Sequence, residues 1–313
     1  MIPKLELIVT QGPYSSFVRD VAAANLVCGI RLNTIMPVKE GRLREKLDEL
    51  RSAAAPKTLW VDLKARQLRV VAFANTPYTA VTISHRFRVN LPATVFFDNG
   101  RITGQLADID GHQLIIENYT GRMIGPGESV NIPDDSLEYL EPDVLTPLDQ
   151  VYVELCKQLG IRHFMLSYVE SAADITALRA LAPGCEIMAK IENQKGLRHL
   201  PAICRAADHV MAARGDLYTE VALPHLIGQA LEQIISQSGF TAVVASRLFE
   251  SLLRHPVPSC PDMMDALYLL ALGYRRFMIG DDICFQRDVL FRALRIFTAL
   301  AKLPPPRVAG END

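Results

Sequence analysis

Short apolar segments that alternate with amphipathic segments are the feature that most constrains how this chain can fold. Eight segments have the length of a strand: residues 5–10, 29–33, 58–63, 162–169, 186–191, 209–215, 241–246 and 275–280. Continuous apolar runs of this length are typical of parallel strands buried on both faces. Most are followed by a stretch such as 171–182 or 287–301, whose apolar residues recur every three or four positions and indicate a helix.

Eight strand–helix units predict a (β/α)8 barrel, also called a TIM barrel. The alternative is an open, doubly wound sheet. Eight units, and the absence of a glycine-rich phosphate-binding turn after the first strand, favour the barrel.

One segment breaks this alternation. From about Val70 to Tyr139 the sequence has only short strand patterns, with turn signals at 98–100 and 110–111. We therefore predict an α/β chain with a small all-β lid domain inserted after the third barrel strand. The expected bounds are 1–70 and 141–302 for the barrel, 71–140 for the lid and 303–313 for a tail.

Composition excludes several classes of protein. The formal net charge is −2 and the sequence pI is about 6.4, so no broad basic field exists for nucleic acid. No apolar run approaches the roughly 20 residues of a membrane span, and the N-terminus does not resemble a signal peptide. We expect a cytoplasmic enzyme with neither nucleic acid nor membrane as a partner.

Polar residues gather at the carboxyl ends of the predicted strands, where barrel enzymes carry their active sites. They include Arg31, Asn33, Asp62, Lys190, Glu192, Arg214, Asp216, Ser246, Asp281 and Asp282. Residues two apart on a strand share a face, so Lys190 and Glu192 should point the same way, as should Arg214 and Asp216. Salt bridges at a barrel rim are the alternative explanation for any single pair.

Glu192 and Asp216 end adjacent predicted strands, so their carboxylates are expected to converge above the barrel. Two carboxylates with open coordination positions suit Mg²⁺ or Mn²⁺. Lys190 beside that metal ion could neutralise a phosphate or an enolate oxygen.

Residues 188–221, MAKIENQKGLRHLPAICRAADHVMAARGDLYTEV, resemble the centre of the pyruvate kinase family. In that family, Lys-Ile-Glu-Asn and Ala-Arg-Gly-Asp-Leu strand ends form the metal and phosphoenolpyruvate site. IVTQGPYS, CGIRLN, WVDLKARQLR, FFDNGRIT and VVASRLFESLLRHPVPS resemble further parts, so the likeness covers about residues 4–300.

The resemblance implies a role for each matching residue. The catalytic set is Lys190 for the phosphoryl group and enolate oxygen, Arg31 for phosphate, Ser246 for proton delivery and Asp282 in the same network. The substrate-binding set is Asn33, Asp62, Arg69 and Gly215, and the metal ligands are Glu192 and Asp216. The implied small molecule is phosphoenolpyruvate, pyruvate or a similar 2-oxo acid, and we expect a homo-oligomer.

The part that resembles the nucleotide and cation sites departs from the family. Ile35 and Leu63 stand where the family offers oxygens to K⁺, so K⁺ is not expected to be required. Met36 stands at a histidine position, and Glu128 replaces a lid lysine that faces the nucleotide phosphates. Arg66 could partly compensate by binding a phosphate, and the use of ADP stays open. No counterpart of the family's C-terminal regulatory domain is expected.

Three functional hypotheses follow from these residues. The first is metal-dependent enolpyruvate chemistry of the pyruvate kinase type. The second keeps the enolate but makes the protein a lyase or aldolase. The third is a non-catalytic relative that binds a 2-oxo acid or a partner; joint retention of Lys190, Glu192 and Asp216 argues against it.

Overall fold

The computed structural model describes residues 4–74, 80–120, 122–141 and 143–303. Apart from Leu303, the predicted tail lies outside these residues. None of the helices in the described ranges combines the length and the apolar character needed to cross a membrane.

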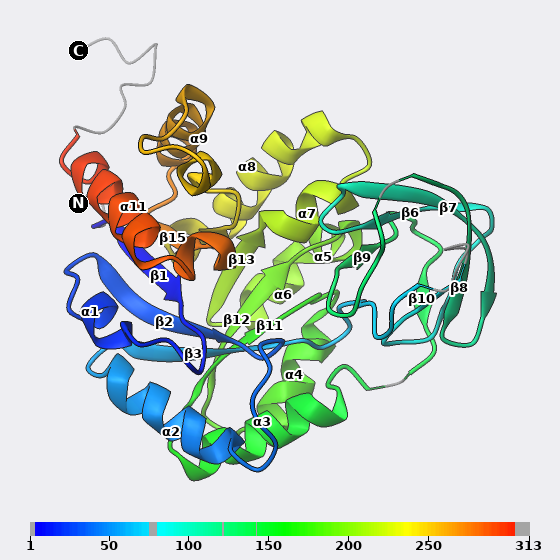
Figure 1. Ribbon diagram of the computed structural model, residues 1–313, viewed down its shortest axis with the longest axis horizontal. Coiled ribbons are helices and arrows are strands. Elements are labelled where there is room, and N and C mark those ends of the chain that lie inside the picture. Colours follow the sequence, from blue (N-terminus) through cyan, green and yellow to red (C-terminus); the bar gives the residue numbers. More distant parts are fainter. Residues whose placement is uncertain (1–3, 75–79, 121, 142, 304–313) are drawn as a thin grey trace.

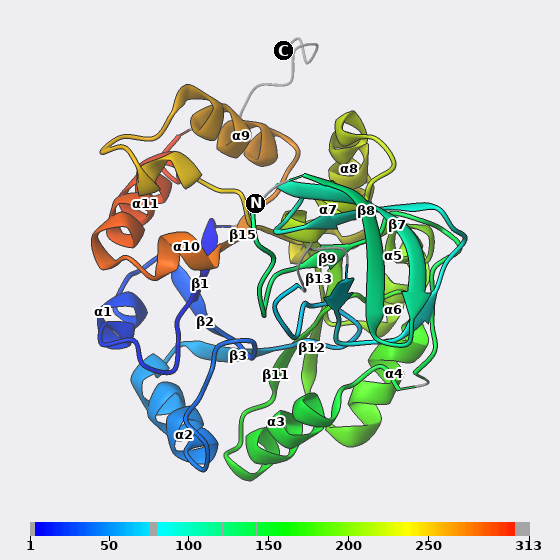
Figure 2. The same ribbon diagram turned by 45° about the vertical axis from the view of Figure 1, so that its right-hand side comes forward.

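Eight parallel strands close into a barrel, which confirms the predicted fold class (Figures 1 and 2). The strands are β1 (Glu6–Thr10), β2 (Val27–Asn33), β3 (Thr58–Leu63), β11 (His163–Leu166), β12 (Glu186–Ile191), β13 (His209–Ala213), β14 (Val243–Ala245) and β15 (Arg276–Ile279). β1 pairs with both β2 and β15, which closes the ring.

Helices surround this ring. They are α1 (Val18–Ala22), α2 (Leu43–Ala54), α3 (Pro147–Gln158), α4 (Ala172–Leu181), α5 (Gln194–Arg198), α6 (Leu200–Ala206), α7 (Arg214–Glu220), α8 (Ile227–Ser238), α9 (Cys260–Ala271), α10 (Asp281–Cys284) and α11 (Arg287–Leu300). Thr146 caps α3 by accepting a hydrogen bond from the backbone N–H of Asp149, whose carboxylate in turn accepts from the Thr146 N–H.

The inserted segment after β3 is all β, as predicted. It contains β4 (Ala80–Thr82), β5 (Phe87–Arg88), β6 (Ala93–Phe97), β7 (Ile102–Asp110), β8 (Gln113–Thr120), β9 (Val130–Asn131) and β10 (Glu138–Tyr139). Five of them form the sheet β4-β8-β7-β6-β9, with its own apolar cluster that extends from Leu68 to Leu137. The boundary of 71–140 for this lid stays a prediction.

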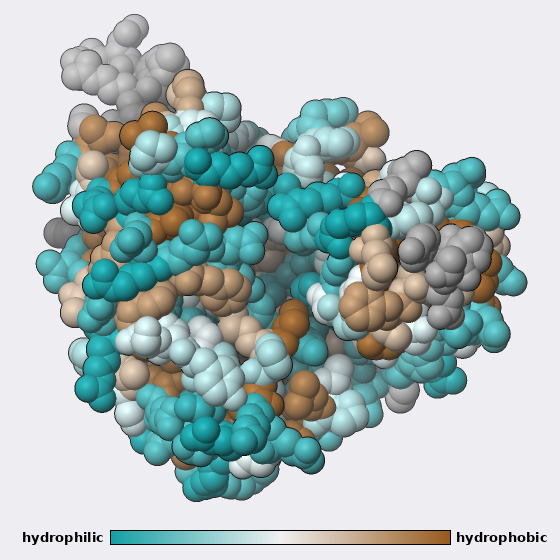
Figure 3. All heavy atoms as spheres, viewed as in Figure 1, coloured by the Kyte–Doolittle hydropathy of each residue, from teal (hydrophilic) through white to brown (hydrophobic). Residues whose placement is uncertain are grey.

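The lid contacts the barrel through several polar groups. Lys195 donates to the carbonyl oxygen of Leu137, and Arg198 pairs with Asp135 at 2.8 Å. A side chain at Gly100 on the lid would meet Thr219 of α7 at 2.6 Å, so the hairpin tip lies directly against that helix. In Figure 3 the lid forms a separate lobe, and the surface is hollowed where it meets the barrel.

The barrel interior changes from apolar to polar along the strands. Its apolar part is a cluster of nine buried side chains: Ile8, Trp60, Met165, Met188, Met211, Ala213, Val243, Ala245 and Met278. Two residues further along their strands, Trp60 gives way to Asp62 and Met188 to Lys190. Because alternate strand residues share a face, these two polar side chains point into the same interior space. The polar side chains therefore lie next to a buried apolar cluster inside the barrel.

Candidate active site

One cavity opens at the carboxyl ends of the strands, and its volume is about 600 Å³. Its lining includes all ten predicted site residues: Arg31, Asn33, Asp62, Arg69, Lys190, Glu192, Gly215, Asp216, Ser246 and Asp282. They come from six barrel strands or the loops that follow them, so tertiary folding brings together residues up to 251 positions apart in the sequence.

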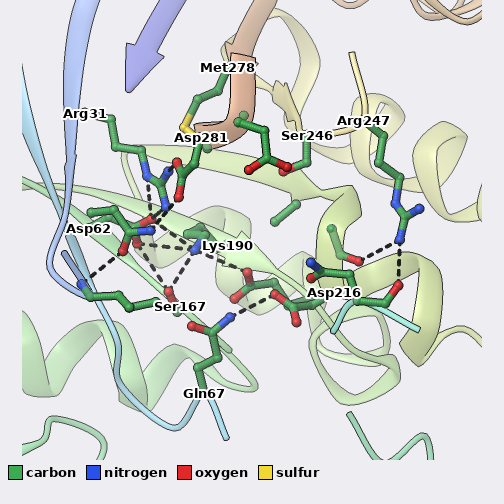
Figure 4. Close-up of a pocket in the computed structure, with 18 of the residues that line it drawn as sticks. Arg31, Asp62, Gln67, Ser167, Lys190, Asp216, Ser246, Arg247, Met278 and Asp281 are labelled. Carbon is green, nitrogen blue, oxygen red and sulfur yellow. Dashed lines mark hydrogen bonds and ion pairs between the residues drawn. The ribbon is translucent and has the colours of Figure 1, made fainter. Parts of the chain in front are cut away.

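Lys190 lies at the centre of the inner half of this cavity (Figure 4). Its Nζ lies 3.2 Å from Asp62 Oδ2 and 3.2 Å from Glu192 Oε1, and it donates to Ser167 Oγ at 2.8 Å. Burial alone would lower the pKa of Lys190, but the charges of Asp62 and Glu192 outweigh it and raise the pKa. The ammonium group therefore stays protonated inside the barrel.

Asp62 links Lys190 to Arg31. The Arg31 Nε and Nη2 reach Asp62 Oδ2 at 2.8 and 2.6 Å. Burial would raise the pKa of Asp62, but the charges of Lys190 and Arg31 and their hydrogen bonds hold it below its usual value. Arg31 also donates to Thr10 Oγ1 and to Asp281, so its guanidinium is held on both sides.

Glu192 lies at the end of β12 beside Asp216. Burial and the charge of Asp216 raise the pKa of Glu192 to about 7, against the opposing effect of Lys190. The backbone N–H of Tyr168 donates to Glu192 Oε2 at 2.7 Å. Tyr168 has a φ of 49°, an uncommon value for a residue with a side chain, and this bend belongs to the loop that contacts Glu192.

Asp216 accepts hydrogen bonds from two amides. Gln67 Nε2 reaches Asp216 Oδ2 at 2.9 Å, and Asn131 Nδ2 reaches Asp216 Oδ1 at 3.0 Å. Asn131 belongs to the lid strand β9, so the lid contacts a predicted metal ligand directly. Neither Gln67 nor Asn131 was predicted from the sequence, because a single amide side chain carries no pattern.

The structure corrects the prediction for Arg214 and Asp216. β13 ends at Ala213 and α7 begins at Arg214, so the strand alternation used for this pair does not apply. Arg214 pairs with Asp265 at 2.7 Å and donates to the carbonyl oxygen of Ser246, whereas Asp216 lines the cavity. Arg214 therefore holds the loop after β14 and is absent from the cavity lining.

Asp281, the neighbour of the predicted site residue Asp282, belongs to the Arg31 network. Its carboxylate accepts from Arg31 Nη1 and, at 2.8 Å, from Asn33 Nδ2. Asp282 is exposed and lines the mouth of the cavity. The helix α10 begins at Asp281, so the chain leaves the strand direction one residue before Asp282 and only the first of the two aspartates faces Arg31.

Two residues of the predicted nucleotide region lie elsewhere. Arg66 pairs with Asp174 at 2.9 Å, next to the first turn of α4. Glu128 pairs with Arg122 at 2.6 Å. Neither Arg66 nor Glu128 is among the residues that line the cavity, so Arg66 does not supply the compensating charge expected there.

Glu220 is a further buried carboxylate of this region. It accepts from Asn131 Nδ2 at 3.1 Å and lies 3.5 Å from the Tyr168 hydroxyl. Burial, with a contribution from Asp216, raises the pKa of Glu220 to about 8. The group is therefore largely protonated at neutral pH in the metal-free protein.

The raised pKa of Glu220 predicts how stability depends on pH. An unfolded glutamate titrates at about 4.3, so between roughly pH 4.3 and 8 the folded chain binds the extra proton. The free energy of unfolding should therefore fall as pH rises through this window, by up to a few kcal/mol. Glu220→Gln should reduce this slope in urea unfolding at pH 5, 6.5 and 8 with EDTA. Glu154→Gln, at an exposed site, is the control, and an equal slope in both variants would contradict the prediction.

Comparison with known proteins agrees with this geometry. The pyruvate kinase barrel domain model matches residues 60–278. A pyruvate kinase of Methanocaldococcus jannaschii is 23% identical over 321 residues, which cover 97% of this chain and 70% of that protein.

Two bacterial relatives match smaller parts of their own length. A pyruvate kinase of Agrobacterium vitis is 30% identical over 60% of this chain and 40% of that protein. One of Borreliella burgdorferi is 21% identical over 87% of this chain and 62% of that protein. The chain thus spans 40% to 70% of the length of these three relatives. With the family model covering most of the barrel, the chain belongs to the pyruvate kinase family.

Proposed function

We propose that this protein carries out divalent-metal-dependent enolpyruvate chemistry on phosphoenolpyruvate, pyruvate or a similar 2-oxo acid. The observation that carries the proposal is the buried ammonium of Lys190, held between Asp62 and Glu192 at the floor of the cavity. A fixed positive charge in a site shielded from water stabilises an oxyanion far better than the same charge in water.

The residues present fit a hard divalent cation. Glu192 and Asp216 both line the cavity, and the charge of Asp216 contributes to the raised pKa of Glu192. Two buried carboxylates that repel each other offer the oxygen ligands Mg²⁺ and Mn²⁺ prefer. Glu192 and Asp216 would hold this ion, and the chemistry it supplies when bound is Lewis-acid stabilisation of an enolate oxygen.

The other side chains have separate tasks. Lys190 stabilises negative charge on the enolate oxygen or the transferred phosphoryl group. Arg31 binds the phosphate, and its orientation depends on Asp62 and Asp281. Ser246 lies across the cavity from Arg31 in Figure 4, where its hydroxyl could deliver a proton to the enolate carbon.

Phosphoryl transfer to ADP is the activity that the resemblance to pyruvate kinases implies, but residues expected at the cation site differ from those of the family. Ile35 and Leu63 line the cavity where the resemblance would place hydroxyl oxygens for K⁺. An aliphatic side chain cannot coordinate a hard cation. We expect Mg-ADP to bind with a dissociation constant of about a millimolar or weaker, roughly −4 kcal/mol.

We predict that the rate of the reaction is the same in K⁺ and in Na⁺, because two of the four oxygens expected around K⁺ are absent. The measurement is turnover at matched ionic strength in KCl and NaCl. Stimulation by K⁺ of more than about threefold would show that other oxygens replace those of the missing hydroxyls.

A metal-dependent lyase or aldolase is the second candidate, and the aliphatic residues Ile35 and Leu63 favour it. The same enolate could arise by decarboxylation of a 2-oxo acid, or could add to an aldehyde. A non-catalytic protein that binds a 2-oxo acid is the third, and the intact Lys190–Asp62–Glu192 network supports it least.

Exchange of the methyl protons of pyruvate for deuterium tests the proposal. NMR in D₂O with Mg²⁺, with and without phosphate, should show exchange faster than in the protein-free control. Exchange without pyruvate formation from phosphoenolpyruvate and ADP would favour the lyase or aldolase. Absence of exchange in every mixture would contradict formation of an enolate from pyruvate and favour the non-catalytic candidate.

A further inference from the structure

Tyr168 is connected to both of the carboxylates assigned to the metal ion, one at each end of the residue. Its backbone N–H donates to Glu192 Oε2 at 2.7 Å. Its hydroxyl accepts a hydrogen bond from Asn131 Nδ2 at 2.7 Å, and the same amide group donates to Asp216 Oδ1 at 3.0 Å. One residue therefore joins the two carboxylates, directly at Glu192 and through a single amide group at Asp216.

The backbone at Tyr168 is fixed in an unfavourable conformation. Its φ of 49° lies in the left-handed region, which residues with side chains rarely adopt. The residues on both sides are tied to barrel strands: the Ser167 N–H donates to the carbonyl oxygen of Leu63, and the Val169 N–H to that of Lys190, at 3.3 Å each. Strain of this kind persists only where the surrounding structure imposes it, and it gathers at functional sites.

The side chain of Tyr168 acts from behind the carboxylates. Tyr168 is 3% exposed, and neither it nor Asn131 is among the described residues that line the main cavity. Tyr168 instead lines a separate cavity of about 30 Å³, which has room for water but not for a substrate. Any effect of Tyr168 on the chemistry must therefore pass through the groups that it holds in place.

The amide of Asn131 is oriented as a donor. Its Nδ2 faces three oxygens, those of Tyr168, Asp216 and, at 3.1 Å, Glu220. Its Oδ1 is buried without a partner in the part of the chain that the structure describes, which is unfavourable by itself. The opposite orientation would turn this oxygen towards the carboxylate of Asp216 and lose the hydrogen bonds. The Asn131 amide is therefore a fixed link between the Tyr168 hydroxyl and Asp216.

The remaining oxygens of the two carboxylates are held as well. Gln67 Nε2 donates to Asp216 Oδ2 at 2.9 Å, and Lys190 Nζ lies 3.2 Å from Glu192 Oε1. Each of the four carboxylate oxygens thus has a donor supplied by the protein. The distance between the carboxylates is set by these contacts and does not depend on an ion to fix it.

We propose that Tyr168 is a positioning residue that fixes the separation of Glu192 and Asp216 and so makes the site select Mg²⁺ over Ca²⁺. Mg²⁺ demands a near-ideal octahedron with oxygens at about 2.0–2.1 Å, whereas Ca²⁺ accepts flexible arrangements at about 2.3–2.6 Å. A rigid pair of carboxylates suits the smaller ion, and a loosened pair can move apart to admit the larger one. The inference rests on the proposed function, which assigns the two carboxylates to the metal ion.

Tyr168→Phe tests this role, because it removes the hydroxyl and keeps the backbone N–H. Free Mn²⁺ is counted by electron paramagnetic resonance, and Mg²⁺ and Ca²⁺ affinities are obtained by competition with Mn²⁺, on the whole protein without pyruvate. The variant should bind Mg²⁺ about threefold to tenfold more weakly, the effect of losing one hydrogen bond. Its Ca²⁺ affinity should fall by less than about twofold, because Ca²⁺ tolerates the looser geometry.

Tyr274→Phe is the matched control. The Tyr274 hydroxyl is also buried and donates to the carbonyl oxygen of Leu231 at 2.8 Å, but the residue lies just before β15 begins, at the opposite end of the barrel. Its loss should leave both affinities unchanged.

Asn131→Ala breaks the same link from the lid and serves if Tyr168→Phe does not fold; it too should lose more Mg²⁺ than Ca²⁺ affinity. If the Tyr168 hydroxyl acts through Asn131, the double variant should bind Mg²⁺ no more weakly than Asn131→Ala alone. Additive losses in the double variant would show that the hydroxyl acts by another route and would overturn the inference.

Equal losses for Mg²⁺ and Ca²⁺, or unchanged Mg²⁺ binding by folded Tyr168→Phe, would also overturn it. Metal binding and pyruvate proton exchange by the unaltered protein in that case would show that the proposed function stands without this role of Tyr168. If the unaltered protein binds neither Mn²⁺ nor Mg²⁺, the metal assignment itself fails, and the inference fails with it.

Discussion

Replacing Lys190 with methionine is expected to slow pyruvate proton exchange by about a thousandfold, roughly 4 kcal/mol of transition-state stabilisation. The physical reason is that Lys190 is the cation between Asp62 and Glu192 at the floor of the cavity. Without it, charge developing on the enolate oxygen would face two carboxylates and no ammonium. Exchange rates by NMR and Mn²⁺ affinity by electron paramagnetic resonance give the two readouts.

Mn²⁺ binding should persist in this variant, because the proposed ligands remain in place. Loss of one partner from a buried ion pair also costs stability, about 3–5 kcal/mol. Folding is therefore checked by circular dichroism, and Lys190→Arg serves as a second variant if the first does not fold. Lys157→Met, at an exposed position of α3, is the control. Turnover within about tenfold of the unaltered protein, or 1.4 kcal/mol, would show that Lys190 is only a structural charge.

Glu192→Gln and Asp216→Asn should each weaken Mn²⁺ binding by about a hundredfold or more, roughly 2.7 kcal/mol, and abolish activity with it. Each substitution keeps the size of the side chain but removes an anionic oxygen, the ligand a hard cation prefers. Binding is measured directly by counting free Mn²⁺, so the result does not depend on knowing the substrate.

Glu186→Gln provides a matched control for these two variants. Glu186 begins the same strand that ends next to Glu192, but it lies at the opposite end of the barrel near His163 and His209. Its loss should leave Mn²⁺ affinity unchanged. Unaltered Mn²⁺ affinity in both Glu192→Gln and Asp216→Asn would remove the basis for the metal assignment.

Much of the fold could be predicted from the sequence because the apolar runs of the strands and the three-to-four-residue spacing of apolar residues in the helices are both strong. Buried parallel strands need continuous apolar runs, and these mark all eight barrel strands within a few residues. The turn signals 98–100 and 110–111 lie between β6 and β7 and between β7 and β8. The first helix after the lid begins at Pro147, after a Thr146 cap of the kind that a sequence shows directly.

The ends of the strands were harder to predict. Arg214 and Asp216 looked like neighbours on one face of a strand, but the chain enters α7 at Arg214 and separates them. Asp281 and Asp282 are equivalent by residue type, and only the start of α10 decides which one meets Arg31. If a strand ends one residue earlier than expected, every side chain that follows points in a different direction.

The sequence by itself determined the barrel and the inserted lid, because strand patterns act locally along the chain. The rule for carboxyl ends identified eight of the ten predicted site residues, and the resemblance to pyruvate kinases added Arg69 and Gly215; all ten line one cavity. The tertiary structure alone decided which charges are neutralised. Arg66 forms an ion pair with Asp174, and Glu128 forms one with Arg122; no local pattern identifies these partners. Arg247 stays without a carboxylate partner among the described residues, although nothing in its sequence neighbourhood marks it. Ion pairs depend on distances between segments that are far apart in the chain, and only the folded molecule sets those distances.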